Sequence, residues 1–181
     1  MIRNVLCLHG MGQTKRSLKT ILTHIERNTT ANFHYIEAPY KMPGCPGFRW
    51  FDRDSNYQTK HEQISCSIDL ISEYSLRYGI DTLFGFSQGG MMVNLALMFS
   101  PDVLQSVDRA IIMSGYRQQS ELSNLPKLPV TLLNINSIAE TYQNPLPVGG
   151  YQCLEEVTHD KGHKIVINQD IKHRVHMLLD K

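Results

Sequence analysis

The sequence feature that most constrains the fold is the stretch GFSQGG at residues 85–90, which joins a short apolar run to an apolar helical pattern. Residues 81–86 have the pattern of a buried strand, and residues 89–100 have that of the helix after it. Ser87 therefore stands between glycines at a strand-to-helix turn. Only a missing Cβ lets two such flanking segments pass close together, so the pattern G-x-S-x-G predicts a strained turn that lifts the Ser87 hydroxyl above a sheet.

Apolar strand patterns and helical patterns alternate along the rest of the chain. Near-continuous apolar strands separated by helices indicate an α/β fold, with a compact, mostly parallel six-stranded sheet and helices on both faces. No linker or repeat interrupts the pattern, so we expect one domain over residues 1–181 with no lid domain. The expected strands are 4–10, 33–38, 81–86, 109–115, 129–135 and 151–158, and the expected helices are 17–28, 62–79, 89–100 and 164–180.

Composition narrows the function classes. Of the 181 residues, 41% are hydrophobic and 19% are charged, which is typical of a soluble globular protein. The formal net charge of +1 gives no electrostatic case for a nucleic acid or an acidic partner. No apolar run reaches the roughly 18 residues that span a bilayer. The apolar part of the N-terminus is too short for a signal peptide, and we expect it to form the first strand.

The four cysteines form no C-x-x-C pair, which favours a reduced, cytoplasmic protein. Cys7 and Cys66 lie in strand and helix patterns, where we expect small buried apolar residues. We expect no metal and no other cofactor. The sequence does not indicate an oligomeric state.

Active sites of open parallel sheets lie outside the carboxyl ends of the strands, so the loops after the strands hold the candidate residues. The backbone N–H of Gln88, at the start of a helix, is one expected donor to an oxyanion. The Met11 N–H, in the glycine-flanked loop after the first strand, is the second. His9 precedes that loop. We expect His9 to form structural hydrogen bonds rather than act as a base. We also place His9 among the residues at the edge of the site that binds substrate.

A serine hydroxyl such as that of Ser87 is a weak nucleophile unless a base removes its proton, and we expect this base late in the chain. His163 is favoured because Gly162 lets its loop bend and a helix is expected directly afterwards, and His159 is the alternative. The third member of a triad is expected after the fifth strand, where Glu140 is the only carboxylate in residues 132–145. The neutral alternatives in that segment are Asn134, Asn136 and Ser137.

The segment 38–60 is rich in proline, glycine and aromatic residues, and it follows the second strand. Trp50 and Phe51 are expected to wall a substrate pocket, with Tyr116 from the loop after the fourth strand. The alternative for the two rings of residues 50–51 is a small satellite core that holds the loop to the body. Without a lid, the pocket is expected to be shallow and to favour short acyl groups.

These residues together resemble the fungal-type family of small serine hydrolases (FSH), which includes the ovarian-cancer-associated gene 2 protein. The resemblance covers nearly the whole chain. It is carried by LCLHGMGQT, YIEAPY, GFRWFD followed by NY, GFSQGG, AIIMSGY and DKGHKIV. GFSQGG is also similar to the acyl-protein thioesterases, which are usually longer and lack RWFD.

The resemblance implies an α/β-hydrolase fold and a serine esterase or thioesterase that acts on small to medium acyl groups. Ser87 matches the nucleophile of the family and His163 its base. The family usually has an aspartate in a G-x-x-D segment after the fifth strand, and here Ala139 stands in its place with Glu140 beside it. Either Glu140 replaces the aspartate, or a weaker Ser–His dyad operates, or the chain is an inactive binding protein on a hydrolase fold.

Overall fold

The computed structural model describes residues 2–115, 128–139 and 151–180. In these residues the main sheet has six strands, and each strand runs parallel to its neighbours. The strands are β1 Asn4–Leu8, β2 Asn32–Ile36, β5 Thr82–Phe86, β6 Arg109–Met113, β7 Leu128–Ser137 and β8 Tyr151–His159. Their order is β2-β1-β5-β6-β7-β8, so the chain reverses direction across the sheet between β1 and β5. Such a reversal places a crevice at the carboxyl ends of these two strands.

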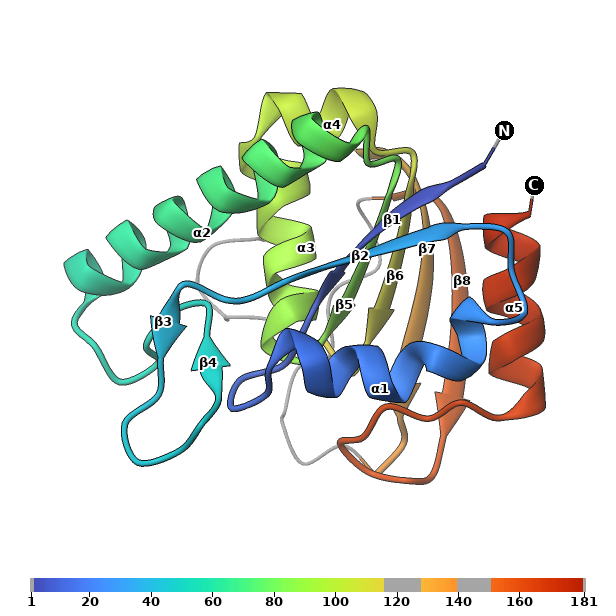
Figure 1. Ribbon diagram of the computed structural model, residues 1–181, viewed down its shortest axis with the longest axis horizontal. Coiled ribbons are helices and arrows are strands. Elements are labelled where there is room, and N and C mark those ends of the chain that lie inside the picture. The colour runs from blue at the N-terminus through green and yellow to red at the C-terminus, as the bar shows by residue number, and fades with distance from the viewer. Residues whose placement is uncertain (1, 116–127, 140–150, 181) are drawn as a thin grey trace.

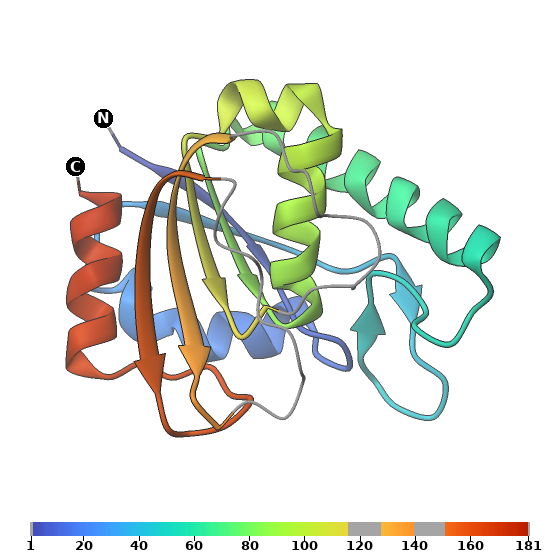
Figure 2. The same cartoon turned by 180° about the vertical axis from the view of Figure 1, so that it is seen from behind.

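Helices cover both faces of the sheet, which confirms the expected layers. α1 Lys15–Glu26 and α5 Gln169–Leu179 lie on one face (Figure 1). α2 Tyr57–Tyr78, α3 Gln88–Phe99 and α4 Pro101–Ser106 lie on the other, as the view from behind shows (Figure 2). Each face has its own core. Leu6 and Leu8 of β1 pack with the second group of helices, and Val5 and Cys7 pack with the first group, as the alternation of side chains along a strand requires.

Side-chain caps set the helix ends, and they correct the expected boundaries. α1 begins two residues earlier than expected because Thr14 and Ser17 form a capping box. The side chain of Asn56 caps α2, so that helix begins at Tyr57 rather than near residue 62. α5 begins only at Gln169, after its cap Asn168, and not directly after His163.

Two elements were not expected. The segment 38–60 contains a small antiparallel hairpin, β3 Tyr40–Lys41 with β4 Phe48–Arg49. Pro101 does not only end the preceding helix: it opens α4, with Ser100 as the N-cap.

One burial prediction was also wrong. Cys7 is fully buried as expected, but Cys66 is exposed on the outer side of α2. Within the described part of the chain, no helix has both the length and the hydropathy that crossing a membrane requires.

Candidate active site

Ser87 occupies the turn between β5 and α3 with a backbone that serine rarely adopts, φ 53° and ψ −118°. The flanking glycines show why the turn is possible. A Cβ on Gly85 would lie 2.5 Å from the Gly89 carbonyl oxygen, and a Cβ on Gly89 would lie 2.2 Å from the Leu8 carbonyl oxygen. Either contact is far too short, so both positions need glycine. The close passage predicted for this turn is therefore present in the structure.

The structure brings His163 to Ser87 from the other end of the chain. The imidazole Nε2 lies 2.7 Å from Ser87 Oγ, which is a short hydrogen bond. The ring also packs against Phe86, with ring centroids 5.3 Å apart. Gly162, directly before His163, has φ 69° in the left-handed region. That glycine turns the loop after β8 back over the end of β5.

The loop that carries His163 is held by one buried hydroxyl. Ser137 Oγ, at the end of β7, accepts hydrogen bonds from the backbone N–H groups of Gly162 (3.0 Å) and Ala139 (3.1 Å). The same hydroxyl donates to the His159 carbonyl oxygen at 3.2 Å. Ser137 therefore ties the loop after β7 to the loop after β8. It acts on the backbone and was considered in the sequence only as a substitute for the acid.

The alternative base, His159, ends β8 and is buried. Its Nδ1 accepts a hydrogen bond from the backbone N–H of Lys161 at 3.2 Å, so the ring supports the turn that leads to His163. Asp160, between them, is exposed and pairs with the Lys161 ammonium group. Of the two histidines in this segment, His163 is the one bonded to the Ser87 hydroxyl.

The residue expected as the acid, Glu140, lies outside the described residues, as does Tyr116. The neutral alternatives from β7 lie within them. Asn134 donates to Glu156 at 3.4 Å, and Ser137 binds the backbone as described above. The third member of a triad thus stays a prediction.

The expected oxyanion donors lie on adjacent pieces of backbone. In the loop after β1, three N–H groups have acceptors: Gly10 donates to Gln13 Oε1, Gly12 to the Phe48 carbonyl, and Gln13 to the Gly10 carbonyl. The Met11 N–H, the remaining donor between them, has no acceptor among the described residues. The N–H of Gln88, the first residue of α3, also has no acceptor within residues 2–115, 128–139 and 151–180.

The two donor segments are in contact. The carbonyl groups of Leu8 and His9 border the Cα of Gly89, the residue after Gln88. The loop after β1 therefore lies directly against the N-terminus of α3. Two unused N–H groups beside a nucleophile at a helix N-terminus are the arrangement that stabilises a tetrahedral oxyanion.

The side chain of Gln88 has a second, unexpected task. Its Oε1 accepts from the Trp50 N–H and its Nε2 donates to the Phe51 carbonyl, both at 2.9 Å. Trp50 in turn donates its indole N–H to the His9 carbonyl at 2.8 Å. The aromatic segment is thereby bonded to both segments that carry the expected oxyanion donors. No local signal in the sequence links Gln88 to a segment 37 residues away.

These contacts correct three expected substrate-binding residues. Trp50 is 0% exposed and Phe51 is 1% exposed, and both belong to the core under α2 and α3. His9 is 0% exposed, with Nδ1 2.8 Å from the Gly10 carbonyl oxygen and Nε2 accepting from the Ala38 N–H at 3.1 Å. Buried side chains with these partners support the loops and do not face a substrate. The alternatives given above therefore describe them better: a small core that holds the loop for Trp50 and Phe51, and structural hydrogen bonds for His9.

Burial also affects the charge of His9. Desolvation lowers its pKa, although the Gly10 carbonyl and the Glu37 carboxylate, 3.0 Å from Nε2, oppose this shift. We infer a neutral ring that fixes the backbone on either side of it. This is a structural role.

Ser114 is a residue of this edge that the sequence did not single out. Phe86 of β5 pairs with Met113 of β6, so Ser87 and Ser114 are the next residues of two adjacent strands. Ser114 has φ 47°, and its hydroxyl is buried with no hydrogen-bond partner among the described residues. Strained residues of this kind concentrate at functional sites. The tripeptide Met-Ser-Gly at residues 113–115 gives no sequence signal for this strained conformation.

The sequence matches the family described as serine hydrolase (FSH1) over residues 1–148. No curated protein matches the chain. Many solved structures share its fold, among them a carboxylesterase from Mesorhizobium loti (18% identity, TM-score 0.76, covering 98% of this chain and 88% of that one). A carboxylesterase from Bacillus cereus has 13% identity and TM-score 0.74, with coverage of 99% and 88%. SOBER1 from Arabidopsis thaliana has 17% identity and TM-score 0.69, with coverage of 99% and 98%.

Proposed function

Because this chain belongs to the FSH1 serine hydrolase family, we propose that it cleaves carboxylic esters or thioesters of small to medium acyl groups, through an acyl-enzyme formed on Ser87. The observation that carries this proposal is the 2.7 Å contact between Ser87 Oγ and His163 Nε2. A hydroxyl hydrogen-bonded to an imidazole is the arrangement of an activated serine nucleophile.

In the first step, the Ser87 oxygen attacks the carbonyl carbon of the substrate while its proton moves to His163 Nε2. The carbonyl oxygen becomes negatively charged, and the N–H groups of Met11 and Gln88 bind it. Loss of one such donor typically slows a reaction by about 10²–10³-fold. Both donors come from backbone, so among substitutions only proline, which has no backbone N–H, removes either of them.

In the second half of the step, the bond between the carbonyl carbon and the leaving oxygen or sulfur breaks. The proton on His163 passes to the leaving group, and the acyl group stays on Ser87. Water then attacks the acyl-enzyme with His163 as the base, which releases the acid and restores the serine. The Phe86 ring against the imidazole keeps it in position for both transfers.

We assign the role of the acid to Glu140, which would orient the imidazole and stabilise its charged form. The support is chemical: residues 132–145 contain no other carboxylate. Glu140→Gln keeps the size of the side chain and removes the charge, so we expect kcat to fall by at least about tenfold, and far more if the triad behaves as known ones do. Full activity in this variant would leave a Ser–His dyad.

The substrate class rests on the family and on the structural neighbours, two of which are carboxylesterases by name. A thioester is an equally suitable substrate for the same step, because it differs only in the leaving atom. Measuring kcat/KM for matched oxygen esters and thioesters of the same acyl chains shows which of the two substrate classes the protein prefers.

The test is the hydrolysis of p-nitrophenyl acetate, butyrate and octanoate. We expect turnover of the short esters, and Ser87→Ala should reduce kcat/KM by at least about a thousandfold. Ser65→Ala, which alters an exposed serine on α2, is the control and should change nothing. If the folded wild-type protein cleaves none of these esters and no thioester, the proposal fails and the chain is a binding protein on a hydrolase fold.

A further inference from the structure

β2 forms an open edge of the main sheet. It is the first strand in the order and pairs only with β1 among the described residues. The Asn32 N–H donates to the Arg3 carbonyl, so the backbone groups of Asn32 and, by alternation, of His34 point toward β1. Those of Phe33 and Tyr35 therefore point outward. This edge offers main-chain donors and acceptors that another strand can use.

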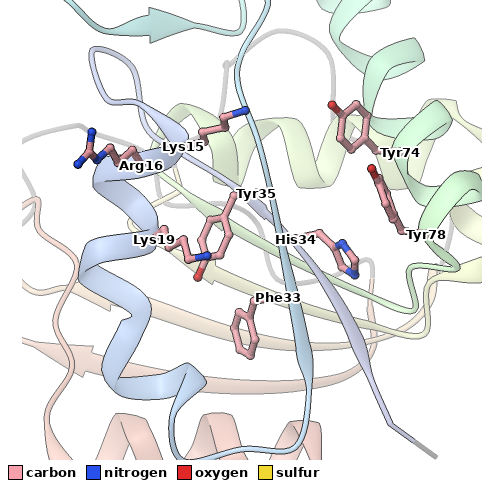
Figure 3. A pocket seen from close by; sticks show the side chains of 8 residues that line it. All are labelled: Lys15, Arg16, Lys19, Phe33, His34, Tyr35, Tyr74 and Tyr78. Carbon is pink, nitrogen blue, oxygen red and sulfur yellow. The ribbon is translucent and has the colours of Figure 1, made fainter.

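A hollow of about 400 Å³ follows this edge between two helices. Figure 3 shows that β2 runs between the cationic side chains of α1 and the tyrosines of α2. We call this hollow the β2 groove; its lining residues are Lys15, Arg16, Lys19, Phe33, His34, Tyr35, Tyr74 and Tyr78.

The α1 side of the β2 groove is positively charged. Lys15, Arg16 and Lys19 are exposed, and no described carboxylate forms an ion pair with them. They lie in the first turns of a helix that has no acidic residue in its first turn, where the helix dipole disfavours cations. Two carboxylates of this region have other partners: Glu37 accepts from the Lys15 backbone N–H, and Glu26 accepts from the Tyr35 hydroxyl.

The α2 side of the β2 groove is aromatic. The imidazole of His34 lies 4.7 Å from the Tyr78 ring, which lies 5.6 Å from the Tyr74 ring, centroid to centroid. Tyr78 is 37% exposed. An apolar or aromatic side chain placed here would cover these rings. The two sides of the groove thus favour different side chains.

The geometry points to a docking site in the β2 groove for an extended acidic segment of another protein, which adds to β2 as a new edge strand. Strand addition uses the outward backbone groups of Phe33 and Tyr35 for affinity, and alternate side chains for specificity. Successive residues of the added strand point to opposite faces. Carboxylates at every second position would face Lys15 and Lys19, and the apolar residues between them would face Tyr78.

A second copy of this chain is a poor occupant. Antiparallel pairing of β2 with its own copy about a two-fold axis places both α1 helices on the same face of the joined sheet. Lys15, Arg16 and Lys19 of the two copies would then repel one another, which is how edge cations prevent self-association. The same charges attract a partner of opposite charge, so an acidic segment fits where a copy does not.

The test is fluorescence anisotropy with a labelled, N-acetylated peptide Glu-Tyr-Glu-Leu-Glu and the full chain. We expect saturable binding that weakens at least tenfold in the double variant Lys15→Glu/Lys19→Glu. The peptide Lys-Tyr-Lys-Leu-Lys should bind this variant better than it binds the wild type. Lys41→Glu, an exposed lysine outside the groove, is the control and should bind as the wild type does.

A second peptide separates strand addition from simple attraction between charges. Methylation of every backbone amide of the peptide leaves every charge in place and removes the main-chain donors in either strand orientation, so binding should be lost. Equal binding of the methylated peptide would overturn strand addition. No binding of the first peptide, or equal loss in Lys41→Glu, would overturn the site itself. Ester hydrolysis does not enter this test, so the outcome is independent of the function proposed above.

Discussion

Two serines of the catalytic edge share an uncommon backbone conformation. Ser87 and Ser114 are the non-glycine residues with positive φ among those described, and they end adjacent strands. The Ser87 hydroxyl is bonded to His163, whereas that of Ser114 is buried and has no hydrogen-bond partner in the part of the chain that the structure describes. At Ser87 the strained turn accompanies the hydrogen bond to His163. At Ser114 the hydroxyl gains no hydrogen bond among the described residues from this conformation.

Replacing Ser114 should therefore stabilise the fold. In Ser114→Gly the positive φ no longer costs the roughly 1–2 kcal/mol that a side chain adds there, and no buried hydroxyl stays unpaired. Glycine also loses more conformational entropy on folding than serine, which offsets part of this gain. We therefore expect the free energy of unfolding, measured with urea, to rise by about 1 kcal/mol. A loss of stability would show that this hydroxyl has a stabilising partner.

At the scale of elements, the site depends on how the ends of β7 and β8 are joined. The Ser137 hydroxyl makes three hydrogen bonds to backbone groups of the two following loops, one of which carries His163. This residue is a positioning residue because it acts on His163 through Gly162.

Ser137→Ala should lower both stability and activity. Two backbone N–H groups lose their acceptor, which typically costs about 1–3 kcal/mol each when they stay buried and less where water reaches them. We expect kcat with p-nitrophenyl butyrate to fall about tenfold while KM changes little, because the loop that holds the base is loosened.

Ser75→Ala is the matched control, since among the described residues the buried Ser75 hydroxyl bonds only to the Ile71 carbonyl within α2. It should leave kcat unchanged. If both variants lose kcat equally, or if Ser137→Ala keeps full activity, the positioning role is wrong.

The elements also show what the sequence allows one to predict. The order of strands and helices follows from apolar patterns, and the turn at Ser87 follows from two glycines within five residues. Helix starts were misplaced because they depend on single capping side chains such as Asn56 and Asn168. The role of the Gln88 side chain was missed for another reason: its hydrogen bonds join segments far apart in sequence, and only the folded chain brings them together.

At the scale of the whole molecule, the small net charge does not reveal that positive charges are concentrated on one part of the surface. A formal charge of +1 gave no reason to expect an acidic partner, yet α1 carries three cations beside the edge strand β2 that form no ion pair with any described carboxylate. The sheet brings together residues from α1, β2 and α2 that no sequence window contains. The same sheet order fixes where the catalytic edge lies, since β1 and β5 are neighbours at the reversal.

Amide hydrogen exchange tests this sheet order. Residues of the central strand β5 are buried throughout and should exchange only by global unfolding. In β2 we expect alternation: the outward amides of Phe33 and Tyr35 should exchange at least about a hundredfold faster than that of His34, which points to β1. Uniform protection along β2 would mean that its edge is covered in solution.

The central claim is that His163 activates the Ser87 hydroxyl. The most direct measurement is the rate at which a fluorophosphonate probe reacts with the protein, with the modified residue located by mass spectrometry. We predict modification at Ser87, slowed at least about a hundredfold by His163→Ala and unaffected by His173→Ala, which changes an exposed histidine on α5. Modification at another residue, or an undiminished rate in His163→Ala, would contradict the account.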